Sequence, residues 1–135
     1  DFVFDDMTDA GSYSYYIDLN DYDFEYGKLY YKLLHTNVLE VRNGPSYNEL
    51  TTAVIPSYIN YGGQKCMVAS IGSGAFENCE NLSDITGGQN LRSIHANAFE
   101  NTAFILDDNN WEDGVLYLNN CLIAAMIYLV LFLNL

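Results

Sequence analysis

Two histidines, His35 and His95, are the side chains of this sequence best suited to acid–base chemistry near neutral pH. Neither is placed near a serine or cysteine in a recognised nucleophile motif. The 18 acidic residues supply many carboxylates, but carboxyl catalysis needs a pair whose pKa values are driven apart by their environments. We therefore predict no catalytic residue and expect that the chain is not an enzyme.

The spacing of the polar residues gives little support to metal or phosphate chemistry. Residues 18–23 resemble the start of a calcium loop, but the loop lacks the glycine at its sixth position and the glutamate at its twelfth, which is Leu29. The glycines at 72–74 and 87–88 are followed by no nucleotide-binding pattern and are typical of turns. We expect no metal and no cofactor. A loosely bound cation stays open at two acidic groups, namely Asp18, Asp21 and Asp23, or Asp107 and Asp108.

The cysteines Cys66, Cys79 and Cys121 form no CxxC pair, and no cluster with histidine has zinc-binding spacing. An odd number leaves at least one thiol free or paired with another chain, and one internal disulfide stays open. We expect each cysteine to pack as a small buried hydrophobe.

The net charge of −13 disfavours two kinds of partner. Eight acidic residues lie within residues 1–25, before the first basic residue, Lys28, and ten of the 12 tyrosines precede residue 62. Such a charge repels nucleic-acid phosphates and anionic membranes, so we expect neither as a partner. We interpret residues 1–22 as an acidic, tyrosine-rich arm, and the high tyrosine content of the first half favours strands.

An internal repeat is the strongest signal in the chain. Residues 68–79 align with residues 91–102 at an offset of 23, with six identities in twelve positions. In a solenoid, each coil repeats the same inward positions, and stacking joins them into one core. We therefore predict equivalent buried positions in successive coils for two residue pairs, Ile71/Ile94 and Phe76/Phe99.

Local patterns define the elements around this repeat. The Ala-Phe-Glu-Asn stretch of each copy suits a short helix or 3₁₀ turn, and residues 82–86 suit a short strand. Residues 50–56 resemble residues 82–88 at an offset of 32, which predicts an irregular earlier coil. Two hairpins, one turning at Gly62-Gly63 and one spanning residues 28–41, would cover the open end of the solenoid.

These patterns predict a short right-handed solenoid of α+β or mainly β class with an N-terminal β-hairpin cap. Its expected parts are the arm, the capping hairpins with an irregular first coil, the repeats with an inter-repeat segment, and an apolar tail, at residues 1–22, 23–67, 68–125 and 126–135.

The tail is too short for a standard transmembrane helix and lacks flanking Lys or Arg. Three interpretations stay open: a buried terminal element, an unnatural end caused by truncation or a shifted reading frame, or contact with a membrane or another chain. An exposed tail would provide a surface for self-association.

Residues 70–79, Ser-Ile-Gly-Ser-Gly-Ala-Phe-Glu-Asn-Cys, resemble the signature of BspA-like leucine-rich repeats, the treponemal class of surface proteins. The order of the segments 29–34, 50–56 and 110–125 extends the resemblance over residues 23–125. It implies a leucine-rich-repeat fold, a secreted or cell-surface location, and adhesion to host matrix proteins or other cells. Thr86-Gly-Gly-Gln departs from the Ile/Leu-Pro of the family, which removes one apolar rung.

The expected binding face is the outer side of the concave strands, because solenoids bind through such extended surfaces. With Leu82 and Ile85 in the core, the residues expected to face solvent are Ser83, Asp84 and Thr86, with Thr51 and Thr52 as their counterparts in the earlier coil. Trp111 either serves as an exposed contact aromatic or covers the edge of the last coil. The expected partner is a protein of the host matrix or a cell surface, or a glycan. The alternative function is a structural N-terminal cap of a longer array, with no binding site of its own.

Overall fold

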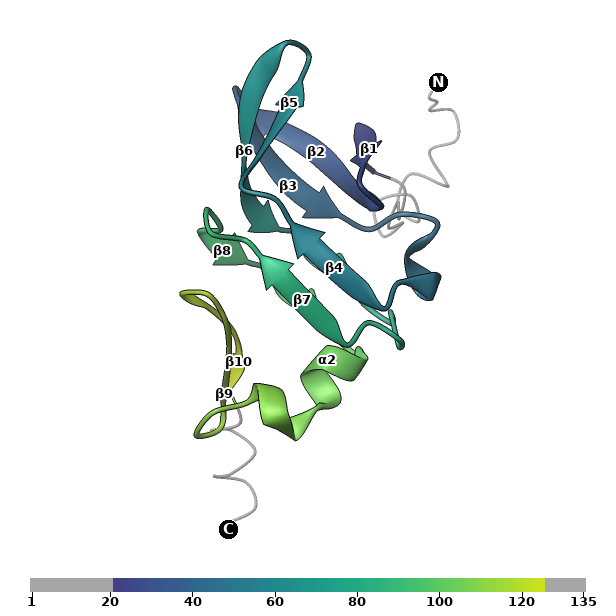
Figure 1. Ribbon diagram of the computed structural model, residues 1–135, viewed down its shortest axis with the longest axis vertical. Helices are drawn as coiled ribbons and strands as arrows, with labels where there is room; N and C mark the ends of the chain where they lie inside the picture. Colours follow the sequence, from purple (N-terminus) through teal and green to yellow (C-terminus); the bar gives the residue numbers. More distant parts are fainter. Residues whose placement is uncertain (1–20, 126–135) are drawn as a thin grey trace, which may run out of the picture.

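The computed structural model describes residues 21–125 (Figure 1), so nearly all of the expected acidic arm and the whole apolar tail, residues 126–135, lie outside the described residues. The described part is mainly β, and its helices are all short. Its elements are β1 (Phe24–Tyr26), β2 (Leu29–His35), β3 (Val38–Arg42), η1 (Tyr47–Glu49), β4 (Thr52–Ile55), β5 (Tyr58–Tyr61), β6 (Gln64–Ile71), β7 (Asp84–Gly87), β8 (Ser93–Ile94), α2 (Ala103–Leu106), η2 (Asp108–Asn110), β9 (Val115–Leu118) and β10 (Cys121–Ala125).

Two hairpins form where the sequence predicts them. β2 pairs with β3 across Thr36 and Asn37, and β5 pairs with β6 across Gly62 and Gly63. The two glycines have φ angles of 62° and 79°, and two successive positive φ angles are the signature of a type I′ turn, whose twist matches that of the strands it joins. β1 extends the first hairpin by pairing antiparallel with β2.

The repeat folds into successive coils that are in register. β6 pairs in parallel with β8, and the partners Ser70 and Ser93 are separated by the 23 residues of the sequence repeat. β3 pairs in parallel with the other edge of β6. Backbone bonds continue beyond the strands, where the Phe76 amide donates to the Ala98 carbonyl at 2.7 Å. The prediction of stacked coils is therefore confirmed.

The Ala-Phe-Glu-Asn stretch forms single turns of the 3₁₀ type, so of the two expected forms the turn is confirmed and the short helix is wrong. The amides of Ala75, Glu77 and Cys79 each bond the carbonyl three residues back, whereas those of Phe76 and Asn78 bond the next coil. Every second amide is thus committed to the stacking of coils and cannot contribute to a helix. Asn78 also has a φ of 67°, in the left-handed region that interrupts a helix.

Aromatic rings form a column through the core, parallel to the stacking direction. Phe76 and Phe99 stack with their centroids 5.4 Å apart, and both are buried, which confirms the predicted phenylalanine pair. The column continues to Tyr47, 5.2 Å from Phe76, and on to Tyr30. Phe104 closes its other end against Phe99 at 5.7 Å. These contacts join five aromatic side chains into one column within the core.

The predicted isoleucine pair occupies equivalent positions in successive coils, but only one of its two side chains is fully buried. Ile71 and Ile94 are partners in the β6–β8 ladder. Ile71 is fully buried, whereas Ile94 is only half-buried against the core. The reason is position, because β8 is the last strand of this ladder among the residues that the structure describes.

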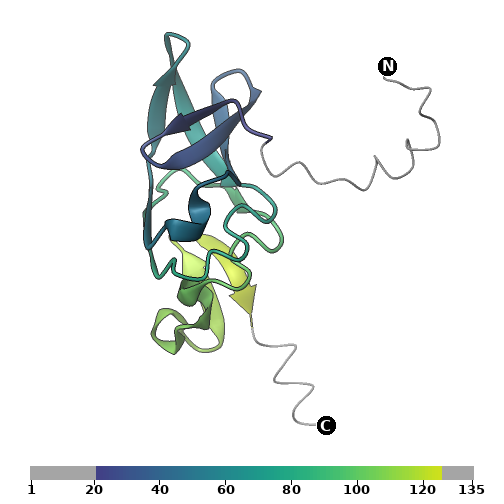
Figure 2. The ribbon, with the colours of Figure 1, turned by 90° about the vertical axis from the view of Figure 1, so that its right-hand side faces the viewer.

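A second, smaller parallel sheet faces the first across the core. β4 and β7 lie side by side in front of the strands β3, β6 and β8 (Figure 1). Ala53, Ile55 and Ile85 point inward from β4 and β7 and are buried with Val68 and Ile71 of β6 in one hydrophobic cluster. The register of β4 with β7 has the offset of 32 that the sequence predicts for the irregular coil. Figure 2 shows the coils edge-on, with the terminal hairpin β9–β10 at one end.

Removing the hydroxyl group from each of two buried tyrosines should change the free energy of unfolding differently. The hydroxyl of Tyr31 is buried without a hydrogen-bond partner among the described residues, whereas that of Tyr47 accepts a bond from the Tyr30 amide at 2.8 Å. Tyr31→Phe should therefore leave the free energy of unfolding unchanged or raise it by about 1 kcal/mol, and Tyr47→Phe should lower it by about 1 kcal/mol. Urea unfolding followed by circular dichroism measures both, and an equal loss in the two variants would contradict the difference in hydrogen bonding.

Candidate functional site

The outer face of β4 and β7 carries the side chains that the sequence predicts to face solvent. The parallel register places Thr52 beside Asp84 and the next outward pair, Val54 and Thr86, one rung further on. All four side chains are exposed, while Ile85 between them points into the core. The alternation of a half-buried strand therefore produces a continuous polar strip across two coils.

Thr51 and Ser83 extend this strip beyond the first rung. Both are exposed, and the Ser83 amide donates to the Thr51 carbonyl at 3.0 Å. Leu50 and Leu82, which precede them, are buried and fix the chain at the start of each strand. The structure thus brings all five predicted site residues of the two strands together on one surface.

Val54 is the residue of this face that sequence reasoning missed. Its side chain is 65% exposed, on the last outward rung of the strip beside Thr86. Its apolar character suggests a core position, but Ala53 and Ile55 on either side of it are buried. The alignment of Val54 with Thr86 at the offset of 32 was the signal that could have placed it outside. We define the β4–β7 face as Thr51, Thr52, Val54, Ser83, Asp84 and Thr86.

Trp111 lies elsewhere and is only partly exposed. Its ring packs against the core, and its indole N–H donates to the Ile105 carbonyl at 2.8 Å. The carbonyl of Phe104, in the same turn of chain, accepts from the Asn110 amide at 2.9 Å. An anchor for a partner usually has its polar group free for that partner, so these contacts favour the role of Trp111 as a cover for the last coil.

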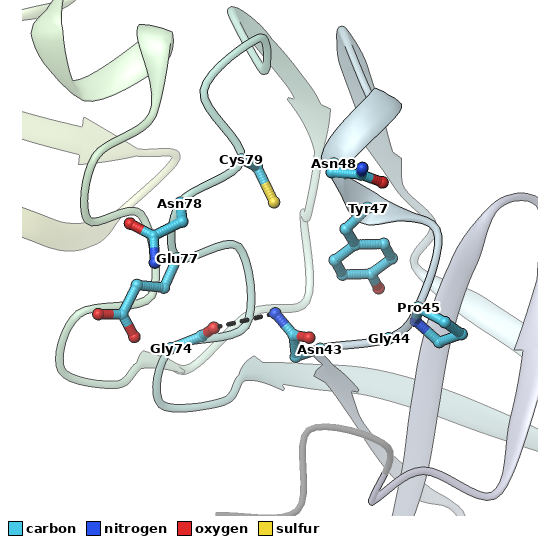
Figure 3. A pocket seen from close by; sticks show the side chains of 9 residues that line it. All are labelled: Asn43, Gly44, Pro45, Tyr47, Asn48, Gly74, Glu77, Asn78 and Cys79. Atoms are coloured by element: carbon cyan, nitrogen blue, oxygen red, sulfur yellow. Dashed lines mark hydrogen bonds between the residues drawn. The ribbon is translucent and has the colours of Figure 1, made fainter.

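A shallow pocket of about 270 Å³ lies between the β3–η1 loop and the turn at residues 74–79 (Figure 3). Asn43 spans it and donates to the carbonyls of Gly74 and Ala75 at 3.4 and 3.0 Å. The Tyr47 ring and the Cys79 thiol line its inner side. The polar group best placed to bind a ligand is thus already used to hold the two segments together.

Glu40 is a buried carboxylate of β3 that contacts side chains of β3, of β6 and of the turn after β8. It accepts bonds from Ser70 Oγ at 2.8 Å and from Arg42 Nε at 2.7 Å, and His95 Nε2 lies 3.4 Å from it. The Ser70 hydroxyl that donates to this carboxylate is itself buried, so it is closed to a substrate from solvent. The network satisfies a buried charge, as burial requires, and local sequence patterns give no sign of it.

The remaining candidates for chemistry are dispersed. Lys32 contacts both Asp21 and Asp23, and its hydrogen bond to Asp21 lowers the pKa of that carboxyl. Asp18 lies outside the described residues. Between residues 21 and 125, no group of three or more histidine, cysteine, aspartate or glutamate residues has the geometry to hold a metal ion.

The three cysteines are buried and unpaired with one another, as small hydrophobes would be. Burial raises the pKa of the Cys79 thiol to about 11. The thiolate is the reactive form of cysteine, so Cys79 is held in its unreactive state at neutral pH. In the part of the chain that the structure describes, no helix is long and apolar enough to cross a membrane.

Stacked coils with side chains in register, and a polar face on a parallel sheet, define this chain as a repeat protein. A family model described as "BspA type Leucine rich repeat region (6 copies)" matches residues 49–122. The chain therefore belongs to the BspA-type leucine-rich-repeat family, as its sequence resemblance indicates.

Two solved structures are similar to part of the chain. A leucine-rich repeat protein from Bacteroides capillosus is 24% identical with a TM-score of 0.43, over 56% of this chain and 72% of that one. A leucine-rich cell surface protein from Faecalibacterium prausnitzii is 20% identical with a TM-score of 0.41, over 62% of this chain. The match spans only 30% of the Faecalibacterium protein. No curated protein matches the sequence.

Proposed function

We propose that this chain is a non-enzymatic binding module, secreted or displayed on a cell surface, that adheres to host matrix proteins or other cells. Its membership in the BspA-type family supports the location and the class of function. In this proposal the coils wind as a right-handed solenoid, the β1–β3 strands cap one end, and the β4–β7 face contacts the partner.

The observation that carries the proposal is the composition of the β4–β7 face. Its hydroxyl and carboxylate groups lie beside one exposed apolar side chain, Val54. The strands beneath are fixed by buried residues, so the face is rigid and loses little entropy when it binds. Two coils offer a small area, so we expect weak affinity from this segment alone.

A protein is the partner that fits this face best. Protein–protein contacts ordinarily combine apolar side chains with polar groups, as this face does. Asp84 provides a carboxylate on the face of a chain whose net charge is −13, so a basic surface would be attracted to it. We keep a glycan as the less favoured ligand, because no aromatic side chain lies on the β4–β7 face.

The test is a binding assay of the full chain with matrix proteins immobilised on a sensor surface. We expect the triple variant Ser83→Lys, Asp84→Lys, Thr86→Lys to bind about tenfold more weakly or worse, since long charged side chains would replace the contact surface. Unfolding midpoints should be unchanged, because all three positions are exposed.

A control variant separates this effect from the change in net charge. The control changes three exposed residues of β1 and the β5–β6 hairpin: Glu25→Lys, Asn60→Lys and Gln64→Lys. Like the first variant, it adds three lysines and removes one carboxylate, so the net charge rises by the same four units. This variant should bind as the unmodified chain does. Equal losses in both variants, or no loss in the first, would refute the β4–β7 face as the contact.

The alternative function, a structural cap without a binding site, is supported by the aromatic packing of the first strands. Phe24 of β1 stacks on Tyr61 at 4.0 Å and on Tyr31 at 5.5 Å. This packing covers the β2 side of the main sheet. A folded chain that binds none of the matrix proteins or cells tested would favour the cap.

A further inference from the structure

Asn43 and Gly44 form the only Asn-Gly dipeptide in the sequence. An asparagine followed by glycine is the pair most open to spontaneous deamidation, because glycine has no Cβ atom to hinder its backbone nitrogen and lets the backbone bend toward the side chain. Each of the other asparagines precedes a residue that has a side chain. The sequence therefore singles out one asparagine of the chain for this reaction.

The packing of the fold fixes both members of this dipeptide. Gly44 is buried, and a Cβ atom at its position would overlap the Tyr30 ring. Asn43 donates through Nδ2 to the carbonyls of Gly74 and Ala75, at 3.4 and 3.0 Å, and so spans the pocket shown in Figure 3. The reactive pair thus lies where the β3–η1 loop contacts the turn across the pocket.

We propose that Asn43 is a site of spontaneous deamidation, and that its conversion releases the β3–η1 loop from the turn at residues 74–79. The Gly44 backbone nitrogen attacks the carbonyl carbon of the Asn43 side chain, and a succinimide ring forms. The Gly44 N–H proton leaves with the side-chain nitrogen as ammonia. One water molecule then opens the ring, which leaves aspartate or isoaspartate at position 43. This reaction does not depend on the proposed adhesion.

The folded structure slows the first step of this reaction without preventing it. Asn43 Nδ2 is both the leaving group and the donor of two hydrogen bonds, so the reaction has to break both of them. The side chain points toward Gly74 in Figure 3 and has to turn toward its own backbone before the ring can close. Asn43 is only partly buried, so we expect the reaction to proceed when the loop opens locally.

Deamidation of Asn43 works in one direction because it replaces a donor with an acceptor. An amide nitrogen donates hydrogen bonds, whereas an ionised carboxylate only accepts them. The new carboxylate would face the carbonyls of Gly74 and Ala75, which are acceptors as well. Glu77 lines the same pocket and adds a second negative charge. The contact across the pocket would therefore be lost and would not re-form.

The first test follows the reaction by mass spectrometry of peptides from the full chain, incubated either folded or unfolded in urea. Deamidation replaces NH₂ with OH, and chromatography separates the aspartate and isoaspartate products. We expect conversion at Asn43 in both samples, at least about tenfold slower in the folded chain, since only the open state reacts. Asn48 is the internal control. It is exposed at the same pocket but precedes Glu49, and it should stay unmodified over the same time.

The second test measures the consequence of the reaction with two matched variants. Asn43→Asp and Asn48→Asp each add one carboxylate at the same pocket. We expect hydrogen–deuterium exchange in residues 74–79 to be about tenfold faster in Asn43→Asp, because this variant loses the bonds across the pocket. Exchange in Asn48→Asp should match that of the unmodified chain.

Three results would overturn the proposal. The first is an absence of conversion at Asn43 in the folded chain. The second is an equal rate in the folded and unfolded chains, which would show that the bonds across the pocket do not hold Asn43. The third is equal exchange in the two variants, which would show that the conversion does not release the loop.

Discussion

Phe76→Ala is expected to lower the free energy of unfolding by about 3–5 kcal/mol, the cost of removing a large buried aromatic side chain. Phe76 is fully buried and is stacked between Tyr47 and Phe99, at 5.2 and 5.4 Å. No other side chain of the column lies at its centre, so the cavity would separate one coil from the next. Urea unfolding followed by circular dichroism gives the value directly.

Val54→Ala is the control for this prediction. Val54 is 65% exposed, so the free energy of unfolding should change by less than about 0.5 kcal/mol. The double variant Phe76→Ala, Phe99→Ala should also differ from the sum of its single variants by about 0.5–3 kcal/mol, as expected of residues in contact. Strict additivity, or a small loss in Phe76→Ala, would contradict the aromatic column.

Gly87→Ala is expected to lower the free energy of unfolding by about 3 kcal/mol, the upper part of the range for a strained backbone position. Gly87 has a φ of 84°, and a Cβ atom there would lie 2.2 Å from the backbone carbonyl oxygen of Ile55. That oxygen also accepts the Gly88 amide at 2.8 Å. The neighbouring strand therefore cannot move away without losing a bond of the β4–β7 sheet.

Gly63→Ala separates the clash from the strain of a positive φ. Gly63 has a φ of 79°, but a Cβ atom there would have no neighbour within 4 Å. We expect a loss of only about 1 kcal/mol, the cost of a left-handed alanine. Equal losses at the two glycines, measured by thermal and urea unfolding, would show that the Ile55 carbonyl is not the obstacle.

Gly87 shows what could be inferred from the sequence and what could not. In the sequence, Thr86-Gly-Gly-Gln is a departure from the family pattern that removes an apolar rung. The structure gives a physical reason for the departure, because a Cβ atom at position 87 would meet the Ile55 carbonyl of the adjacent coil. Packing between coils is a long-range contact, and no local pattern at residue 87 reports it.

The core was predictable where the repeat is regular. The offset of 23 gave the Phe76/Phe99 pair, and alternation gave the outward residues of β7. Tyr47 was missed because it precedes Phe76 by 29 residues, so the same alignment does not find it. Around Phe76 the expected alternatives were a short helix and a 3₁₀ turn. The turn formed, because the amides alternate between local turns and the next coil.

The candidate site was predictable in part for the same reason. A strand fixed by buried residues must present its alternate residues to solvent, which located Asp84 and Thr86. Glu40 was not predictable, because its partners Ser70 and His95 come from strands and turns that only the parallel ladder brings together. Short patterns predict the faces of strands, but they do not predict which strands become neighbours.

Hydrogen–deuterium exchange of the full chain, alone and bound to a matrix protein, tests the central claim most directly. Our account predicts that binding slows exchange in peptides covering Thr52–Ile55 and Asp84–Gly87, the strands of the β4–β7 face. Exchange in the β9–β10 hairpin should be unaffected. Slowed exchange confined to the pocket segments, 43–48 and 74–79, or to the β9–β10 hairpin, would contradict the assignment of the β4–β7 face as the binding surface.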